Sequence, residues 1–229
     1  MLIEYLRNIP LFRHLKEQQI KDIAARCRHK LFKKGEVVFY KTDQGTDLYI
    51  VLSGRLKAIL TDQGGDEIIL AIFDKGAFFG ELSLLDGRGR SATISADMDS
   101  ELAVLSKTDF LELVSRDPRI AVELMITLVE RLRKADELIE SLAFMEVGER
   151  LTRVLLDLDR VGKDRETGYI VVRRLTHKEL ASRIGSSREA VSKCMKLLAV
   201  NGLIKESEDC VYVATDAIER LAFVRKNVR

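Results

Sequence analysis

Residues 80–92 read Gly80-Glu81-Leu82-Ser83-Leu84-Leu85-Asp86-Gly87-Arg88-Gly89-Arg90-Ser91-Ala92, and they determine how the rest of the chain is interpreted. A glycine turn is followed by a carboxylate, a short loop and an Arg-Ser-Ala segment that leads into a strand. A planar guanidinium, a serine hydroxyl and loop amides can hold one phosphate, and a carboxylate can accept a hydrogen bond from a sugar hydroxyl. The stretch therefore predicts a site for a phosphorylated sugar, with the candidate residues Gly80, Glu81, Leu82, Arg90 and Ser91. The alternative is a structural Glu81–Arg90 ion pair at a turn of a sheet.

The residues around this stretch indicate many short strands. After an amphipathic helical region over residues 1–28, segments rich in Val, Ile, Tyr and Phe alternate with glycine turns, which is typical of a jelly roll. A jelly roll can also be a cupin-type metalloenzyme, but that needs clustered histidines, and none lies between His29 and His177. We therefore expect no enzyme and no metal. The strands are predicted near residues 30–33, 36–41, 47–52, 55–61, 67–73, 91–97 and 101–106.

Composition is that of a soluble globular protein, and the charge distribution fits a nucleic-acid-binding domain attached to a second part. The 229 residues are 46 % hydrophobic, with no apolar run long enough to span a membrane and no signal peptide, so we expect a cytoplasmic protein without membrane contact. Residues 146–229 hold 17 Lys and Arg against 13 Asp and Glu, whereas residues 1–145 hold 21 against 23. A basic second part fits a nucleic-acid-binding domain. The three cysteines lie far apart, at Cys27, Cys194 and Cys210, which argues against disulfides and iron–sulfur clusters.

A long helix is predicted from about Pro118 to Ala143. Its apolar residues are spaced 3, 4, 3, 4 and 3 between charged flanks, which is the pattern of a two-stranded coiled-coil seam. The alternative is a helix packed only on its own domain. We expect a parallel homodimer whose seam consists of Met125, Leu128, Leu132, Ala135, Ile139 and Leu142.

Residues 175–214 have the pattern of a helix-turn-helix with a two-stranded wing. Thr176-His177-Lys178-Glu179 and Ser186-Ser187-Arg188-Glu189 each form a capping box that opens a helix, and Gly185 makes the turn between them. The other elements expected in this half are a helix over 147–158, a charged loop over 160–169, wing strands at 203–207 and 210–214, and a last helix over 215–225.

The second of these helices carries residues that suit base recognition. The first turn of a recognition helix reaches base edges in the major groove. There, Arg188 can bond guanine O6 and N7, and Glu189 can accept from a cytosine amine. Thr176, Ser186 and Ser187 can hold DNA phosphates. Alternatively, Arg188 and Glu189 pair on the surface and Glu189 caps the helix.

Three stretches resemble the catabolite activator (cyclic-AMP receptor) and Fnr family of bacterial transcription regulators. They are the cassette Phe79-Gly80-Glu81-Leu82 with Arg90-Ser91-Ala92, the hinge Phe144-Met145-Glu146-Val147, and Ser187-Arg188-Glu189 followed by Val191. The resemblance runs from about residue 5 to residue 225. It implies an α+β protein with a jelly-roll cyclic-nucleotide-binding domain (1–117), a dimerisation helix and hinge (118–145) and a winged helix-turn-helix DNA-binding domain (146–229).

The resemblance also implies roles for the site residues. Glu81 would hold the ribose 2′-hydroxyl, and Arg90 with Ser91 the cyclic phosphate, of cyclic AMP acting as allosteric effector. Arg188, Glu189 and Lys193 would read a palindromic site in double-stranded DNA. A homodimer is implied, with RNA polymerase as a further partner.

Two positions depart from the family pattern. Lys193 stands where the best-known members have an arginine, which removes a bidentate contact. Ala135 and Asp136 stand where cyclic-AMP receptors have a Thr-Ser pair that meets the adenine; Asp136 can accept from adenine or guanine, or can simply be solvated. Cyclic GMP or another ligand, and a ligand-independent regulator, therefore remain alternatives. A further alternative is a ligand-binding module that does not recognise DNA. The haem and iron–sulfur branches of the family lack support in this sequence.

Overall fold

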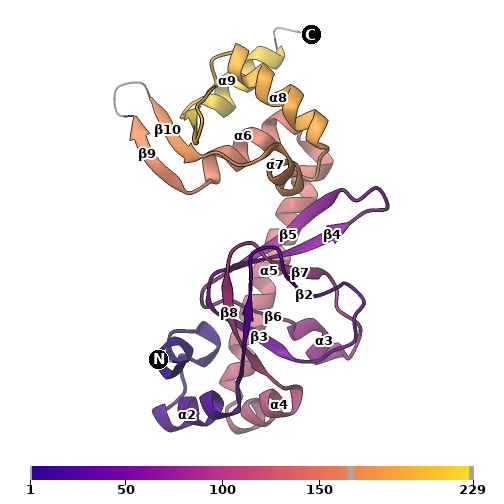
Figure 1. Cartoon of the computed structure of the whole chain (residues 1–229), viewed down its shortest axis with the longest axis vertical. Helices are drawn as coiled ribbons and strands as arrows, with labels where there is room; N and C mark the ends of the chain where they lie inside the picture. The colour runs from indigo at the N-terminus through magenta and orange to yellow at the C-terminus, as the bar shows by residue number, and fades with distance from the viewer. Residues whose placement is uncertain (1, 165–167, 227–229) are drawn as a thin grey trace. The chain divides into compact units, whose positions relative to one another are not determined.

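The computed structural model describes residues 2–164 and 168–226, and it divides the chain into two compact units. The first consists of Met1–Leu60 and Ile69–Ala135, and the second of Thr61–Ile68 and Asp136–Arg229. Figure 1 labels their helices and strands. Each unit contains hydrophobic core clusters of its own.

Two four-stranded sheets form the body of the first unit, and neighbouring strands such as β3 (Leu48–Ser53) and β8 (Ser100–Leu105) pair antiparallel. The jelly-roll class of fold and all seven predicted strands are confirmed, with ends shifted by a few residues. In the order β1-β8-β3-β6, the first sheet adds β1 (Arg28–Phe32) and β6 (Phe78–Phe79). In the order β2-β7-β4-β5, the second consists of β2 (Val37–Phe39), β7 (Thr93–Ala96), β4 (Arg55–Thr61) and β5 (Glu67–Asp74).

A short helix, α3 (Glu81–Asp86), stands where the sequence predicted only a loop, and that prediction was wrong. Gly80 at its start and Gly87 at its end have φ of 89° and 72°. Glycine adopts this left-handed region at little cost, so it can turn the chain sharply into and out of this short helix. Leu84 is fully buried and fixes the helix on the core.

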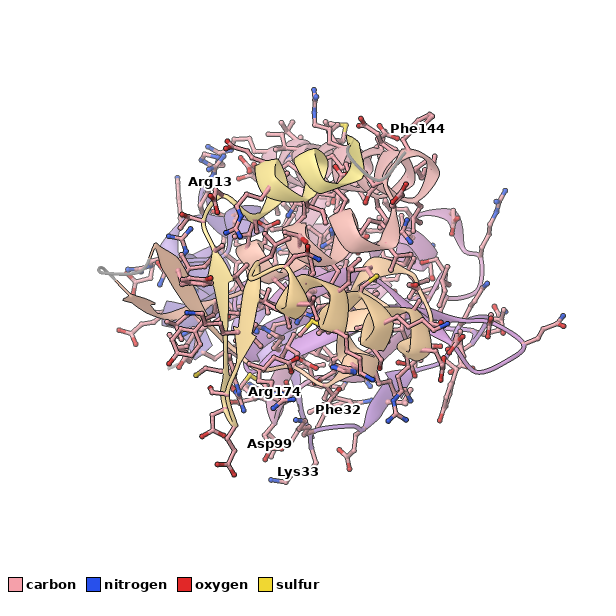
Figure 2. The ribbon with its side chains drawn as sticks, turned by 90° about the horizontal axis from the view of Figure 1, so that it is seen from above. Arg13, Phe32, Lys33, Asp99, Phe144 and Arg174 are labelled. Carbon is pink, nitrogen blue, oxygen red and sulfur yellow. The ribbon has the colours of Figure 1, made fainter. Side chains whose placement is uncertain are left out.

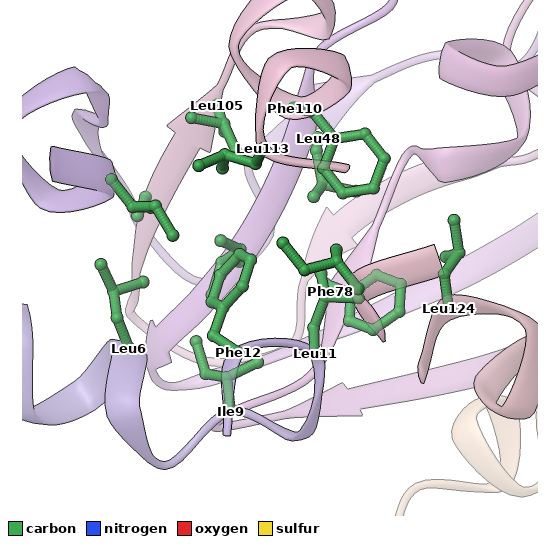
Figure 3. Packing of buried hydrophobic residues seen from close by; sticks show 14 of the residues in the cluster. Leu6, Ile9, Leu11, Phe12, Leu48, Phe78, Leu105, Phe110, Leu113 and Leu124 are labelled. Atoms are coloured by element: carbon green, nitrogen blue, oxygen red, sulfur yellow. The ribbon is translucent and has the colours of Figure 1, made fainter. Parts of the chain in front are cut away.

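The predicted amphipathic region over residues 1–28 consists of α1 (Leu2–Arg7), η1 (Pro10–Phe12) and α2 (Glu17–Arg26). Their apolar side chains enter the same core as the strands, α4 (Lys107–Arg116) and the start of α5 (Arg119–Phe144), as Figure 3 shows. The N-terminal helices are therefore an integral part of the first unit. The cluster includes Leu6, Ile9, Leu11, Phe12, Leu48, Phe78, Phe110 and Leu124.

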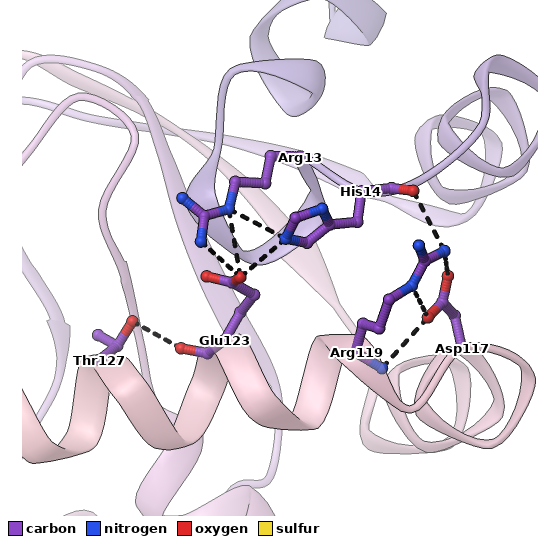
Figure 4. Close-up of polar contacts among 6 residues, drawn as sticks. All are labelled: Arg13, His14, Asp117, Arg119, Glu123 and Thr127. Carbon is purple, nitrogen blue, oxygen red and sulfur yellow. Dashed lines mark hydrogen bonds and ion pairs between the residues drawn. The ribbon is translucent and has the colours of Figure 1, made fainter.

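Polar contacts also hold the N-terminal region to α5 (Figure 4). Arg13 Nη2 lies 2.6 Å from Glu123 Oε1, and His14 Nε2 lies 2.9 Å from the same oxygen. The hydrogen bond from Arg13 keeps the pKa of the Glu123 carboxyl below its usual value. One turn earlier, Arg119 Nη2 pairs with Asp117 Oδ2 at 2.6 Å. The start of α5 is thereby fixed to the first unit by both apolar and polar contacts.

The second unit contains the helix-turn-helix and a four-stranded sheet of order β11-β12-β10-β9. The loop predicted over 160–169 was wrong, because β9 (Arg160–Asp164) pairs antiparallel with β10 (Tyr169–Arg173); residues 165–167 lie outside the described residues. The predicted helices and wing strands are confirmed. They are α6 (Val147–Asp157), α7 (His177–Ile184), α8 (Arg188–Val200), β11 (Ile204–Glu206), β12 (Cys210–Ala214) and α9 (Ala217–Lys226).

No helix within residues 2–164 and 168–226 is long and apolar enough to cross a membrane. The three cysteines are free thiols, and burial raises the pKa of Cys27 to about 11. A thiol with so high a pKa is almost entirely protonated at neutral pH and is a poor nucleophile.

We expect Phe110→Ala to lower the free energy of unfolding by about 3–5 kcal/mol, because it removes a fully buried ring from the core of the first unit. Leu111→Ala is the matched control. Leu111 is the exposed neighbour of Phe110 on α4, and its truncation should lower the free energy of unfolding by about 0.5 kcal/mol or less. Urea denaturation at one protein concentration measures both. Equal losses in the two variants would contradict this description of the core.

Candidate ligand pocket and candidate nucleic-acid interface

Arg90 is a buried cation without a carboxylate partner. Its side chain is 4 % exposed, donates from Nη1 to Gly80 O at 3.0 Å and from Nη2 to Asp47 O at 3.1 Å, and lies 4.4 Å from the ring centroid of Phe39. Among the described residues it forms no ion pair. Burial lowers the pKa of its guanidinium. Because a guanidinium has five N–H donors, Arg90 has donors left for an anion.

Two glycines allow this close approach to Arg90. A Cβ on Gly45 would lie 3.1 Å from Arg90 Nη2, and one on Gly80 would lie 2.8 Å from Nη1 and 2.7 Å from Asp47 O. Any other residue at Gly80 would also strain the backbone, since its φ is 89°. The turn glycine of the sequence motif is therefore needed both for the turn and for the space beside the guanidinium.

Glu81 supplies the second polar feature of the pocket. It is 3 % exposed, and its Oε1 accepts from Arg131 Nη1 of α5 at 2.7 Å, while Arg131 also donates to Phe78 O. Its other oxygen, Oε2, is buried and has no hydrogen-bond partner among the described residues. A buried acceptor of this kind is costly unless a donor reaches it, and a sugar hydroxyl is such a donor. The residues present thus fit a phosphorylated sugar.

The structure brings all five cassette residues of the sequence prediction to one cavity of about 140 Å³. Gly80, Glu81 and Arg90 form its polar end, whereas Leu82 and Ser91 are exposed at its edge. Asp136 and Ala135 are exposed on α5, and neither is among the residues that line the cavity. The other lining residues are Phe39, Ala58, Leu70, Phe73, Phe79, Ser83, Ala92, Ile94 and Arg131.

The alternative of a structural Glu81–Arg90 pair is not what the structure contains, because Glu81 pairs with Arg131. Arg131 was missed as a site residue and was taken only as a charged flank of the seam. A signal for it exists in the sequence. Ile120, Leu124 and Leu128 lie at helical spacing on the face of α5 that packs on the core, and Arg131 continues this face. A cation at the end of a buried face requires a partner.

Local hydrogen bonds begin both helices of the helix-turn-helix. Thr176 caps α7 through Oγ1, which accepts from Glu179 N at 3.1 Å, and the predicted capping box is formed. For α8 the predicted box between Ser186 and Glu189 is wrong: Ser187 is the N-cap, and its Oγ accepts from Ala190 N at 3.2 Å. The cap lies one residue later than predicted because two serines are adjacent and either could serve.

This shift leaves the first turn of α8 free. Arg188, Glu189 and Lys193 are exposed, and the described residues include no partner for any of them. Arg188 and Glu189 neither pair with each other nor cap the helix, which removes the purely structural alternative for them. Ser192 is used differently, since its Oγ lies 2.7 Å from His177 Nδ1 and joins the two helices.

Arg150 of α6 connects the turn of this motif to the end of α5. Its Nε donates to Ile184 O at 3.0 Å and its Nη1 to Met145 O at 2.7 Å, and the side chain is buried. Beside it, a Cβ on Gly185 would lie 2.8 Å from Leu142 Cδ2, and Gly185 has a φ of 59°. The last turn of α5 and the turn before the recognition helix therefore form one packed junction.

Most of the predicted seam is exposed in the single chain. Met125, Leu132, Ala135, Ile139 and Leu142 are exposed, whereas Leu128 is half-buried and packs on the core of its own unit. An exposed apolar stripe of this length is typical of a surface that a partner covers. Further exposed apolar residues on α5 are Val122, Ile126, Val129 and Phe144, the last labelled in Figure 2.

Comparison with known proteins gives two family matches and close relatives over nearly the whole chain. Residues 29–117 match the model of the cyclic nucleotide-binding domain, and residues 149–221 match that of the Crp-like helix-turn-helix domain. The cyclic AMP receptor protein of Thermus thermophilus is 36 % identical over 95 % of this chain and 99 % of its own length. The cAMP-activated global transcriptional regulator Vfr of Pseudomonas aeruginosa is 30 % identical over 82 % of this chain and 90 % of its own.

Solved structures agree with this assignment of the fold. The c-di-GMP responsive global regulator CLP of Xanthomonas campestris superposes with a TM-score of 0.77 at 27 % identity, covering 87 % of this chain and 99 % of that one. The catabolite activator protein of Thermus thermophilus gives a TM-score of 0.53 at 36 % identity, covering 94 % of this chain and 99 % of that one. Both of these solved structures thus share the fold of this chain.

We expect Arg131→Ala to destabilise the first unit by about 3 kcal/mol, because it leaves the Glu81 carboxylate buried without a counter-charge. Arg133→Ala removes an exposed cation from the same helix and should cost about 0.5 kcal/mol or less. Adding Glu81→Gln to Arg131→Ala should recover part of the loss. Urea denaturation compares the three, and a loss no larger than that of Arg133→Ala would show that the pair does not contribute to stability.

Proposed function

The chain belongs to the Crp/Fnr family of DNA-binding transcription regulators, and from this we propose that it is a homodimeric, sequence-specific regulator that a cyclic nucleotide controls. Regulators of this family are not enzymes. One observation carries the ligand part of the proposal: the buried Arg90, which has no ion-pair partner among the described residues, lies in the same cavity as the unpartnered Oε2 of Glu81. An anion and a hydroxyl donor on one small molecule would satisfy both.

In this proposal each pocket residue has a defined role. Arg90 donates its remaining N–H groups to the cyclic phosphate, and Ser91 and the first backbone amides of α3 add donors at the edge of the cavity. Glu81 accepts from the ribose 2′-hydroxyl through Oε2, while Arg131 holds its other oxygen in place. Gly80 keeps the backbone close to the phosphate, and Leu82 covers the sugar.

Cyclic AMP is the ligand that the relatives support best, since the names of two of them state cyclic AMP. Cyclic GMP or another nucleotide is the second candidate, because a carboxylate at Asp136 can accept from both N1–H and N2–H of guanine. The c-di-GMP responsive relative favours keeping this candidate open. A regulator that needs no ligand is a third possibility.

The exposed apolar stripe of α5 supports a parallel homodimer, and dimerisation is typical of the family. In a dimer, two copies of α8 can enter successive major grooves of a palindromic site, about 34 Å apart. Arg188, Glu189 and Lys193 would contact bases, and Thr176, Ser186 and Ser187 would contact phosphates. Ligand binding would favour the DNA-competent state of the dimer.

The remaining assignments follow from the family. We propose a sensor domain over residues 1–117, a dimerisation helix and hinge over 118–145 and a DNA-binding domain over 146–229. RNA polymerase is the expected protein partner, and the cytoplasm is the expected location.

We expect Arg90→Ala to abolish binding of cyclic AMP and cyclic GMP while leaving a folded protein, because the phosphate then has no guanidinium to contact. Arg88→Ala removes an exposed cation from the same loop and should leave binding unchanged. Calorimetric titration with each nucleotide measures both variants. Unchanged nucleotide affinity in Arg90→Ala would disprove the assigned role, and no binding to the wild-type protein would favour a ligand-independent regulator.

We expect Arg188→Ala to weaken specific DNA binding by about 1–3 kcal/mol, because one bidentate guanine contact is lost. Lys196→Ala, an exposed cation further along α8, is the control and should affect specific and random DNA equally. A gel-shift series on a duplex selected from a random pool, with random DNA beside it, separates the two. Equal loss of both kinds of binding in Arg188→Ala would argue against base recognition, and no salt-dependent DNA binding by the wild type would favour a ligand-binding module without DNA readout.

A further inference from the structure

The turn of the wing, between β11 and β12, lies against the start of α7. Arg174, two residues before the N-cap Thr176, links the two segments. Its Nη1 donates to Ser207 O and its Nη2 to Glu206 Oε2, each at 2.9 Å. Its backbone N–H donates to Asp209 O, also at 2.9 Å. These three hydrogen bonds fix the wing turn beside the segment that enters the helix-turn-helix.

A cavity of about 480 Å³ lies between the wing turn and the start of α7. Thr176 lines it from the side of the helix, and Glu208 and Asp209 line it from the wing. We proposed above that Thr176 contacts a DNA phosphate. A phosphate held there would lie close to both carboxylates of the wing turn. The other lining residues are Val161, Arg173, Arg174, Leu175 and Cys210.

The wing turn carries more negative charge than its neighbours neutralise. Glu206 is paired with Arg174. Glu208 and Asp209 are exposed, and their side chains form no hydrogen bond or ion pair within residues 2–164 and 168–226. Arg173 is exposed and unpaired in the same part of the chain, and it adds one positive charge to the cavity. Two free carboxylates thus stand against one free cation.

The one cation of the wing itself lies away from the turn. Lys205 is the only Lys or Arg in residues 204–214, and its Nζ lies 4.7 Å from the ring centroid of Tyr169. Tyr169 begins β10, whereas Arg173 ends it, opposite Cys210 and beside the wing turn. The ammonium group of Lys205 therefore lies toward the end of the sheet that is remote from the cavity, and it does not compensate the two carboxylates.

We propose that Glu208 and Asp209 repel the DNA backbone, so that the phosphate contacts end at the start of α7 and do not extend to the wing. The inference rests on the DNA binding proposed above. Each phosphate of the duplex is an anion, and like charges at short range raise the free energy of the complex. The wing would then act as a limit to the DNA contact surface of this chain.

The helix-turn-helix presents the opposite charge. Arg188, Lys193 and Lys196 are exposed on α8. Cations that neutralise phosphates release counterions and strengthen binding to any DNA sequence. Repulsion from the wing is equally independent of sequence, because phosphates carry no base information. It would offset part of that general attraction and lower the share of the protein held on random DNA, while the base contacts of α8 keep their discrimination.

The test compares Glu208→Gln with Glu219→Gln, which removes the same charge from the exposed surface of α9. Glu219 is the matched control because its neighbour Arg220 donates from Nη2 to Asn201 O at 3.1 Å, at the far end of α8 from its first turn. A double variant, Glu208→Gln with Asp209→Asn, removes both free carboxylates. Gel shifts of the full chain, with and without cyclic AMP, measure affinity for a selected duplex and for random DNA at about 0.05 and 0.5 M salt.

We expect the double variant to bind both kinds of DNA about tenfold more tightly at the lower salt concentration. This gain is equivalent to about 1.4 kcal/mol, spread over the four carboxylates of a dimer. Glu208→Gln alone should gain about threefold, and Glu219→Gln should leave the affinity unchanged. At the higher salt concentration the gain of the double variant should fall below about twofold, because salt screens the repulsion.

The outcomes separate this inference from the proposed function. Unchanged or weaker DNA binding by the double variant would overturn the repulsion and leave the regulator intact. An equal gain in Glu219→Gln would also overturn it, since the effect would then follow net charge and not the wing. A gain on only one kind of DNA would contradict a phosphate effect. No DNA binding by the wild type or by any variant would disprove the proposed function, and the inference with it.

Discussion

The burial of one cation, Arg90, is the constraint on which the first unit depends. A buried charge without a partner is among the costliest features that a protein can contain. Here the carbonyl oxygens of Gly80 and Asp47 and the ring of Phe39 compensate part of that cost. Gly45 and Gly80 leave room for this arrangement, since a Cβ on either would approach the Arg90 guanidinium closely. The fold therefore keeps a positive charge at the lining of the cavity, where a small anion could pair with it.

The second charge of the pocket connects it to α5, the helix whose exposed apolar stripe we propose as the dimer surface. Glu81 is held by Arg131, which lies on the inward face of α5, while the outward face of the same helix is apolar and exposed. A rotation or shift of α5 would move both faces together, since a helix is stiff over this length. The pocket and the proposed dimer surface thus share one structural element, α5, through the bond between Arg131 and Glu81.

The parts of the structure that could be predicted from sequence are those whose chemistry is local. The cassette, the capping box at Thr176 and the exposed first turn of α8 each lie within a few consecutive residues. The prediction failed where a residue's structure or role depends on a partner elsewhere in the chain. Arg131 acquires its role only by pairing with Glu81, and β9 becomes a strand only by pairing with β10. The missed α3 and the displaced cap at Ser187 are different failures, because there the local signals were present and were assigned to the wrong residue or structure.

The junction at Arg150 has a consequence for how this protein can diverge. Both of its acceptors are backbone carbonyls, those of Met145 and Ile184, so the bonds do not depend on which side chains occupy these two positions. Substitutions there can accumulate without breaking the junction, provided that the backbone path is kept. The donor has no such freedom, since no other side chain offers a planar fork of N–H groups with a permanent charge. Substitutions are therefore expected to be tolerated at Met145 and Ile184 but not at Arg150.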